Sequence, residues 1–317
     1  MYEHFLLPTI PSRDELSEES IRLARSIHAP RTLTEYASDW AGFVTWCSQN
    51  ARSSLPAADE TVARYVTDLL RHGRKIKTAR RHLSALLYYH RKAGCASPVT
   101  PEVRAIITGA QRLRGEQPQQ KAAITVDQLR AMMESIRRPE PYASRDRAVL
   151  VFGFATALRR SSIVSLDLAD TKFTEGGMIV HVRREKQDQA GVGRNIGVPR
   201  GVSAATCPIA ALKRWLDWRG AEPGALFWGM NHGVSGGRMY DNTVARIVKR
   251  AVDSIGLDPD RYGAHSLRAG FVTAALGAGA GEILTARHTG HRSLNTLRLY
   301  LRPEDPFRAN ACAAIGL

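Results

Sequence analysis

The chain has 317 residues, which is long enough for two domains, and lysine and arginine outnumber aspartate and glutamate by 45 to 30, giving a formal net charge of +15 at pH 7. This basic balance indicates a polyanionic partner, with double-stranded nucleic acid as the first candidate and a soluble basic protein without a nucleic-acid role as the alternative. The four cysteines are far apart, which argues against a disulfide framework and a zinc ribbon and favours a protein of the reducing cytoplasm. The chain has no run of about 18 apolar residues, and no long apolar run near its N-terminus, so we expect neither a membrane span nor a signal peptide.

Residues 30–115 have the pattern of consecutive amphipathic helices. Thr32 and Glu35 have the spacing of a capping box, and apolar residues follow at helical intervals. Asp59 can cap the second helix, and two further helices follow with apolar faces that indicate core packing. The first turns of the third helix carry basic residues that are candidate DNA contacts: Lys75, Lys77, Arg80 and Arg81.

A polar run from Gly115 to Lys121 indicates an interdomain linker, because it contains hardly any apolar residue. Thr125 and Gln128 then form a second capping box, which opens a new helix. We therefore predict an N-terminal helical domain over residues 1–116 and a second domain over residues 117–317.

The second half is predicted to be mostly helical with one β-hairpin. Segments 178–182 and 195–198 have strand character and flank a turn rich in Gly, Asp and Gln. Another helix begins at Cys207-Pro208, and Asp241 caps a further one. The glycine-rich stretch 277–281 follows a helix rather than a strand, so it indicates a helix–helix connection and not a dinucleotide-binding loop.

The last third contains the residue types that cleave a phosphodiester. His265 and Arg268 form an H-x-x-R run, a Gly-His pair ends at His291, Tyr300 follows, and Arg159 lies earlier in the chain. Taken singly, each is explained as well by a solvated arginine on a helix or a packed tyrosine. Their order and spacing together are much harder to obtain by chance. No set of metal ligands accompanies them.

Three stretches resemble the tyrosine recombinases, also called the phage-integrase family, which includes the Cre and Xer recombinases: TALRRSSIVSLDL (156–168), HSLRAGF (265–271) and TGHRSLNTLRLY (289–300). The resemblance implies a mainly α fold with a small antiparallel β-sheet in an α+β catalytic domain, and a two-domain, C-shaped clamp around duplex DNA. It also implies that residues 1–116 form a SAM-like helical DNA-binding domain and that residues 117–317 form the catalytic domain.

The resemblance further implies site-specific recombination through a 3′-phosphotyrosine intermediate, without metal or other cofactor, by a homotetramer on two DNA recombination sites. Tyr300 is then the nucleophile, and Arg159 and Arg268 hold the phosphate oxygens with planar guanidinium forks. His265 acts as general base and then as acid. His291 hydrogen-bonds the phosphate or Tyr300 in the transition state.

Some residues are assigned by position alone. Lys186, in the turn of the predicted hairpin, matches the lysine that protonates the leaving 5′ oxygen, with Lys172 as the substitute if the register is shifted. Arg160 is interpreted as a surface or DNA-backbone contact, and His288 as peripheral. The family usually has a carboxylate three residues after the first arginine; Ser162 stands there, so no acidic support residue is carried over.

Two rival functions stay open at this stage: a type IB topoisomerase with the same chemistry, and a catalytically idle DNA-binding protein. The DNA target and the choice among integration, excision, inversion and dimer resolution also stay open. The implied setting is the cytoplasm, in association with the nucleoid, for a protein of bacterial or of phage or mobile-element type. Residues 307–315, after Tyr300, are expected to form a short helix that joins protomers or caps its own domain.

Overall fold

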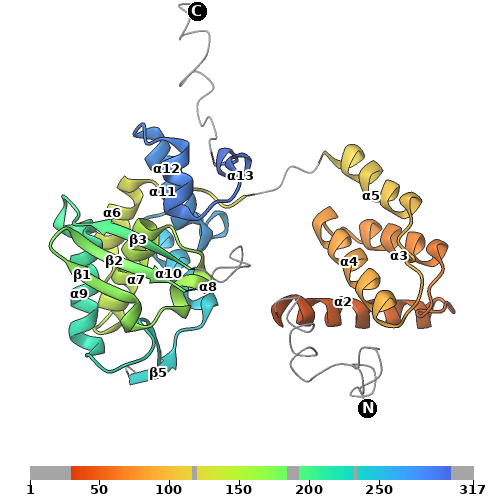
Figure 1. Cartoon of the computed structure of the whole chain (residues 1–317), viewed down its shortest axis with the longest axis horizontal. Coiled ribbons are helices and arrows are strands. Elements are labelled where there is room, and N and C mark those ends of the chain that lie inside the picture. The colour runs from red at the N-terminus through yellow and green to blue at the C-terminus, as the bar shows by residue number, and fades with distance from the viewer. Residues whose placement is uncertain (1–29, 116–119, 184–192, 232–233, 301–317) are drawn as a thin grey trace, which may run out of the picture. The chain divides into compact units, whose positions relative to one another are not determined.

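The computed structural model describes residues 30–115, 120–183, 193–231 and 234–300. Within these ranges the chain is mostly helical with two small antiparallel sheets, which confirms the predicted fold class (Figure 1). The chain divides into two compact units, residues 1–119 and 120–317, called here the N-terminal unit and the C-terminal unit. None of the described helices combines the length and apolar character needed to cross a membrane.

The described helices of the N-terminal unit are α2 (Pro30–Gln49), α3 (Asp59–Arg71), α4 (Ile76–Lys92) and α5 (Pro101–Arg114). Its core is filled by aliphatic and aromatic side chains from all of these helices. Phe43 is fully buried, and the ring of Trp40 stacks on that of Tyr89 with centroids 4.7 Å apart. The aromatic stripes of the sequence are therefore core.

Two helix starts in this unit differ from the prediction. α2 already includes Pro30 and Arg31, so Thr32 lies inside the helix and the predicted capping box is wrong. Glu35 instead forms an ion pair with Arg81 at 3.3 Å. α3 begins at Asp59, which therefore lies in the first turn rather than at the N-cap.

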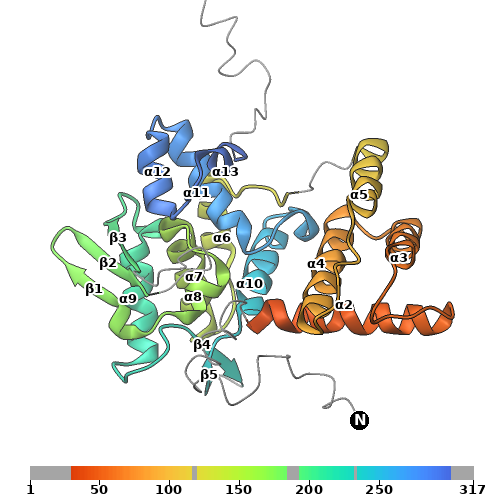
Figure 2. The same cartoon turned by 45° about the vertical axis from the view of Figure 1, so that its right-hand side comes forward.

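The central helix of the C-terminal unit is α7 (Tyr142–Thr156), which is apolar on most sides and is buried along most of its length. The other described helices of this unit are α6 (Val126–Ser135), α8 (Arg160–Ser165), α9 (Pro208–Arg219), α10 (Asp241–Asp253), α11 (His265–Gly277), α12 (Glu282–Thr289) and α13 (Leu294–Arg298). The capping box of Thr125 and Gln128 is confirmed, with reciprocal hydrogen bonds of 3.0 and 3.1 Å. Figures 1 and 2 show α11, α12 and α13 together at one end of the unit.

The predicted β-hairpin is also confirmed. β2 (Gly177–Val182) pairs antiparallel with β3 (Arg194–Pro199), so that Met178 lies opposite Val198, and both side chains are buried. β1 (Thr171–Thr174) adds to the other edge of β2. A separate pair of strands, β4 (Trp228–Asn231) and β5 (Val234–Arg238), completes the described sheets.

Candidate active site

Helix α11 supplies His265 and Arg268, which lie three residues apart and therefore on one face of the helix. Arg268 is almost completely buried, with 1% of its surface exposed. Gly270 allows the helix to pack closely, because a Cβ at this position would lie 2.1 Å from the carbonyl oxygen of Ile124. The arginine is therefore held inside the unit and not on a flexible surface arm.

The turn between α7 and α8 supplies Arg159. Ala157 adopts the left-handed conformation there, with a φ of 51°, which is uncommon for a residue other than glycine. Nη1 of Arg268 donates a hydrogen bond of 2.8 Å to the carbonyl oxygen of Ala157. The charge of Arg159 lowers the pKa of both histidines of the motif, so the two predicted arginines belong to one site.

Helices α12 and α13 bring His291 and Tyr300 against α11. Gly290 ends α12 with a left-handed backbone conformation, at a φ of 70°. His291 is therefore the first residue after this turn. Tyr300 follows α13 and packs on a small apolar cluster that joins these helices. The buried members of this cluster are Val272, Ala286 and Leu297.

Four of the predicted catalytic side chains come together in two close pairs, His265 with Tyr300 and Arg268 with His291. Nε2 of His265 lies 2.6 Å from the hydroxyl oxygen of Tyr300. Nη2 of Arg268 lies 3.0 Å from Nε2 of His291, and the rings of His291 and Tyr300 have centroids 5.6 Å apart. The charge of Arg159 acts on both histidines, which places this arginine in the same region as the two pairs.

Lys186 lies outside the described residues, between the end of β2 at Val182 and the start of β3 at Arg194. The end of β2 is anchored by Arg183, whose Nη2 lies 2.6 Å from Oδ2 of Asp170. Lys172, the substitute, is exposed on β1.

The two histidines are poised as bases rather than as cations. Burial, followed by the charges of Arg268 and Arg159, lowers the pKa of His265 to about 4. The same causes lower the pKa of His291 to about 3. Both rings are therefore neutral at neutral pH in the DNA-free protein. A neutral His265 can accept the proton of Tyr300 across their 2.6 Å contact.

These pKa values predict a loss of stability on acidification. An unfolded histidine has a pKa near 6.5, so below that pH the unfolded chain binds more protons at these two histidines than the folded protein does. The free energy of unfolding should therefore fall as the pH drops through the interval from 6.5 towards 4. Urea unfolding at about pH 7 and about pH 5 measures this, and the double variant His265→Gln, His291→Gln should lose less stability than the wild type. Equal losses in both proteins would contradict the assignment.

Sequence reasoning treats His288 as peripheral, but its side chain lies within the framework of the site. Its Nε2 donates to the carbonyl oxygen of Ala155, near the end of α7, at 2.9 Å, and its ring stacks on Phe271 with centroids 4.5 Å apart. Its own carbonyl oxygen accepts a bond of 2.6 Å from Arg194 on β3. His288 thus connects α12 to the helix before Arg159 and to the hairpin. The only feature of the sequence that points to His288 is its spacing of three residues from His291, and this spacing does not predict contacts with α7 or β3.

The position where the family usually has a carboxylate is buried. Ser162 is 4% exposed, and its carbonyl oxygen accepts a hydrogen bond from Ser165. Arg160, predicted as a surface or DNA contact, forms an ion pair of 3.1 Å with Asp241. Asp241 is the first residue of α10 and not its N-cap, so the predicted capping role is wrong and its carboxylate pairs with Arg160 instead.

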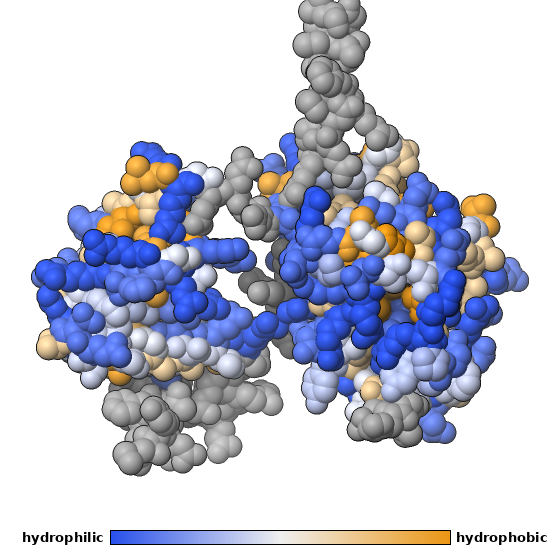
Figure 3. Space-filling view, turned by 180° about the vertical axis from the view of Figure 1, so that it is seen from behind, coloured by the Kyte–Doolittle hydropathy of each residue, from blue (hydrophilic) through white to orange (hydrophobic). Residues whose placement is uncertain are grey.

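Of the basic residues predicted to bind DNA in the N-terminal unit, Lys75, Lys77 and Arg80 are exposed. Arg81 differs, because its guanidinium forms ion pairs with the buried carboxylate of Asp39 at 2.9 Å and with Glu35. Its charge is therefore largely engaged within the fold. The surface of both units in the view of Figure 3 is mostly hydrophilic.

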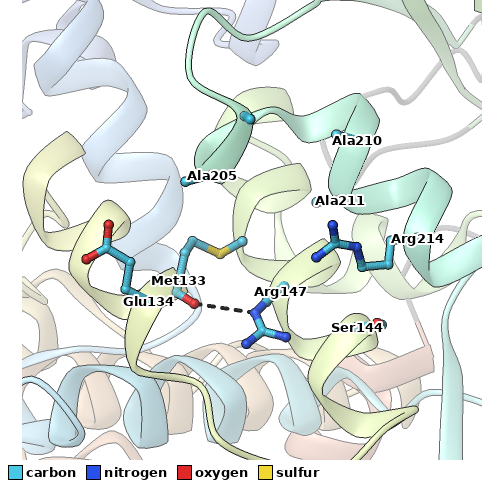
Figure 4. Close-up of a pocket in the computed structure, with 9 residues that line it drawn as sticks. Met133, Glu134, Ser144, Arg147, Ala205, Ala210, Ala211 and Arg214 are labelled. Atoms are coloured by element: carbon cyan, nitrogen blue, oxygen red, sulfur yellow. Dashed lines mark hydrogen bonds between the residues drawn. The ribbon is translucent and has the colours of Figure 1, made fainter.

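A separate pocket of about 280 Å³ lies between α6, α7 and α9, and none of the predicted catalytic residues lines it. Figure 4 shows the alanines Ala205, Ala210 and Ala211 that line it and the side chains of Arg147 and Arg214. Arg147 is engaged with the backbone, since its Nε donates to the carbonyl oxygen of Met133 at 3.4 Å. Among the described residues, no group of three or more His, Cys, Asp and Glu side chains is arranged to hold a metal ion.

The sequence of the chain is similar to known proteins. The model of the phage integrase family matches residues 122–306. An integrase/recombinase XerD homolog of Selenomonas ruminantium is 32% identical, over 95% of this chain and 90% of its own length. A tyrosine recombinase XerC of Pelobacter propionicus is 28% identical, over 86% of this chain and 84% of its own.

Solved structures share the fold. A lambda integrase fragment, as a dimer bound to a core site, gives a TM-score of 0.61 at 17% identity, covering 90% of this chain and 93% of its own. The Tn1549 transposon integrase in complex with transposon right end DNA gives a TM-score of 0.63 at 16% identity, covering 89% and 92%.

Proposed function

Because the chain belongs to the phage integrase family and is a site-specific tyrosine recombinase, we propose that it cleaves and rejoins DNA through a covalent bond between Tyr300 and a 3′ phosphate. The observation that carries this proposal is the 2.6 Å contact between the Tyr300 hydroxyl and Nε2 of a neutral His265. A phenol beside a neutral base, in a site that also contains two guanidinium groups, has what it needs to attack a phosphodiester.

The cleavage step follows from these groups. Tyr300 gives its proton to His265 while its oxygen attacks the phosphorus and the bond to the 5′ oxygen breaks. Arg159 and Arg268 stabilise the charge that the phosphate gains in the transition state. The leaving 5′ oxygen takes a proton from Lys186. Rejoining reverses each transfer, so the phosphotyrosine bond conserves the energy of the broken strand and no ATP is used.

The partner that we propose is a duplex DNA recombination site. The net charge of +15 supports this, because phosphate contacts release counterions. We further propose that residues 1–116 form the DNA-binding domain, which contacts the backbone through Lys75, Lys77 and Arg80, and that residues 117–317 form the catalytic domain. The two would grip the duplex as a clamp, with four protomers on two sites in the bacterial cytoplasm.

An assay of strand cleavage separates this function from the alternatives. Nicked duplexes from the DNA that flanks the gene would trap a covalent adduct, and digestion of the adduct would identify the modified tyrosine. Recombination between two copies of the bound site distinguishes a recombinase from a topoisomerase, which relaxes supercoiled plasmid without pairing sites. DNA binding without any covalent adduct would support the remaining alternative, a DNA-binding protein without catalytic activity.

Lys186→Ala is expected to slow cleavage far more than it weakens DNA binding, because it removes the acid for the leaving 5′ oxygen. A substrate with sulfur in place of the bridging 5′ oxygen should recover most of the rate, since a thiolate departs without protonation. Single-turnover cleavage of both substrates measures this, with Lys172→Ala as the matched control. Sulfur rescue of the Lys172 variant and not of the Lys186 variant would reverse the assignment.

A further inference from the structure

The side chain of Thr289 lies directly behind the imidazole of His291. Thr289 is the last residue of α12 and is fully buried. Its Oγ1 lies 2.6 Å from Nδ1 of His291. The same oxygen lies 2.7 Å from the carbonyl oxygen of Thr285, one turn earlier in the helix.

These two distances determine which atom carries the proton. A threonine hydroxyl has a single hydrogen, and a carbonyl oxygen can only accept. The hydroxyl therefore donates to the carbonyl of Thr285, and its lone pair faces Nδ1 of His291. Nδ1 must then be the protonated nitrogen, because otherwise two lone pairs would face each other at 2.6 Å.

The opposite side of the ring leads independently to the same tautomer. Nη2 of Arg268 lies 3.0 Å from Nε2 of His291, and a guanidinium has donors only. Nε2 must therefore present its lone pair. The pKa of about 3 that burial and the neighbouring arginines impose keeps the ring neutral, so that it carries one proton and not two.

We propose that Thr289 is a positioning residue of the recombination site, whose hydroxyl oxygen accepts the Nδ1–H hydrogen bond of His291 and so holds the ring in the orientation that presents Nε2 to Arg268. The proposal rests on the function proposed for Tyr300 and its neighbours. With the proton on Nδ1, the Nε2 atom accepts from Arg268 and so holds that guanidinium in place before DNA arrives. When a phosphate engages Arg268 and Nε2 gains a proton from solvent, Thr289 can still accept from Nδ1–H. The ring then donates to the phosphate without changing its position.

The tautomer can be observed directly in the DNA-free protein. Nitrogen–proton correlation spectra of isotope-labelled histidine distinguish a protonated Nδ1 from a protonated Nε2, and the His291→Gln variant identifies the signals of this ring. We expect a protonated Nδ1 and a bare Nε2. A protonated Nε2 in the wild-type protein would overturn the proposal, whatever the activity.

The matched variants test the role in the reaction. Thr289→Val keeps the shape and removes the hydroxyl, so it should slow single-turnover cleavage by about tenfold to a hundredfold, with little change in the DNA dissociation constant. Thr289→Ser keeps a hydroxyl as the acceptor of Nδ1–H and should show the wild-type Nδ1–H signal and the wild-type rate. Thr285→Val is the control, because its Oγ1 is buried with no hydrogen-bond partner among the described residues, and it should behave as the wild type.

Three results have distinct meanings. If Thr289→Val shifts or broadens the Nδ1–H signal of His291 and slows cleavage while Thr289→Ser and Thr285→Val do not, the positioning role holds. If Thr289→Val leaves both the Nδ1–H signal and the cleavage rate unchanged, the role is wrong. If the wild type shows the expected tautomer but never forms an adduct at Tyr300, the proposed cleavage fails, and with it the catalytic meaning of Thr289.

Discussion

Tyr300→Phe is expected to abolish the covalent protein–DNA adduct and to leave DNA affinity within about twofold of the wild type, because many phosphate contacts carry binding. The change removes one oxygen and keeps the ring, which packs on the cluster between α11, α12 and α13. No other hydroxyl lies within hydrogen-bond reach of Nε2 of His265 among the described contacts. The nucleophile is therefore lost without loss of the fold.

The measurement is denaturing electrophoresis of the protein with a nicked, labelled duplex, beside a binding titration on the same DNA. Tyr240→Phe is the control, because it removes a phenol oxygen from a side chain that is 77% exposed and should give the wild-type adduct yield. An adduct from the Tyr300→Phe protein that resists denaturant would assign the nucleophile elsewhere.

The second large effect is on stability, at the buried carboxylate of Asp146. One oxygen accepts from Arg145, at 2.7 Å, and the other from Arg138 and Arg250, at 2.8 and 3.0 Å. Asp146 and Arg145 are each only 3% exposed. Asp146→Asn keeps the shape but leaves three guanidinium groups together without their counter-charge. The free energy of unfolding should fall by about 3–5 kcal/mol, as for other broken buried ion pairs.

Urea unfolding followed by fluorescence measures this difference. Asp127→Asn is the matched control, because Asp127 pairs with Arg130 at 2.7 Å but its side chain is 88% exposed. An exposed pair of this kind contributes less than about 1 kcal/mol. If the two variants unfold at the same urea concentration, the cluster around Asp146 contributes no more than a surface pair.

The elements that could be predicted are those whose signal is local. The β2–β3 hairpin follows from alternating buried residues such as Val180 and Val182, and the start of α6 follows from the reciprocal bonds of Thr125 and Gln128. β5 escapes prediction because it is short and contains two glycines. The capping box at Thr32 fails because the helix already includes the residues just before it.

The candidate site also has parts that could be predicted from the sequence and parts that could not. The motif residues could be chosen from the sequence because their order resembles a family, and the family itself is shown by the comparisons. The contact between His265 and Tyr300 could not be predicted from the sequence, because it depends on how α13 packs against α11. The roles of Thr289 and His288 are also invisible in the sequence, since each depends on the carbonyl group or ring that packing places beside it.

The hydrogen bond from Arg268 to Ala157 has a consequence for the entropy of activation of the reaction. Restricting a long, flexible side chain removes about 2 kcal/mol of conformational entropy at room temperature. Here folding has already restricted it, because the guanidinium is buried and bound to the turn beside Arg159. A phosphate that arrives meets a rigid receptor, so little further disorder is lost on the way to the transition state. The side chain of Arg268 should therefore add little to the unfavourable entropy of activation for cleavage.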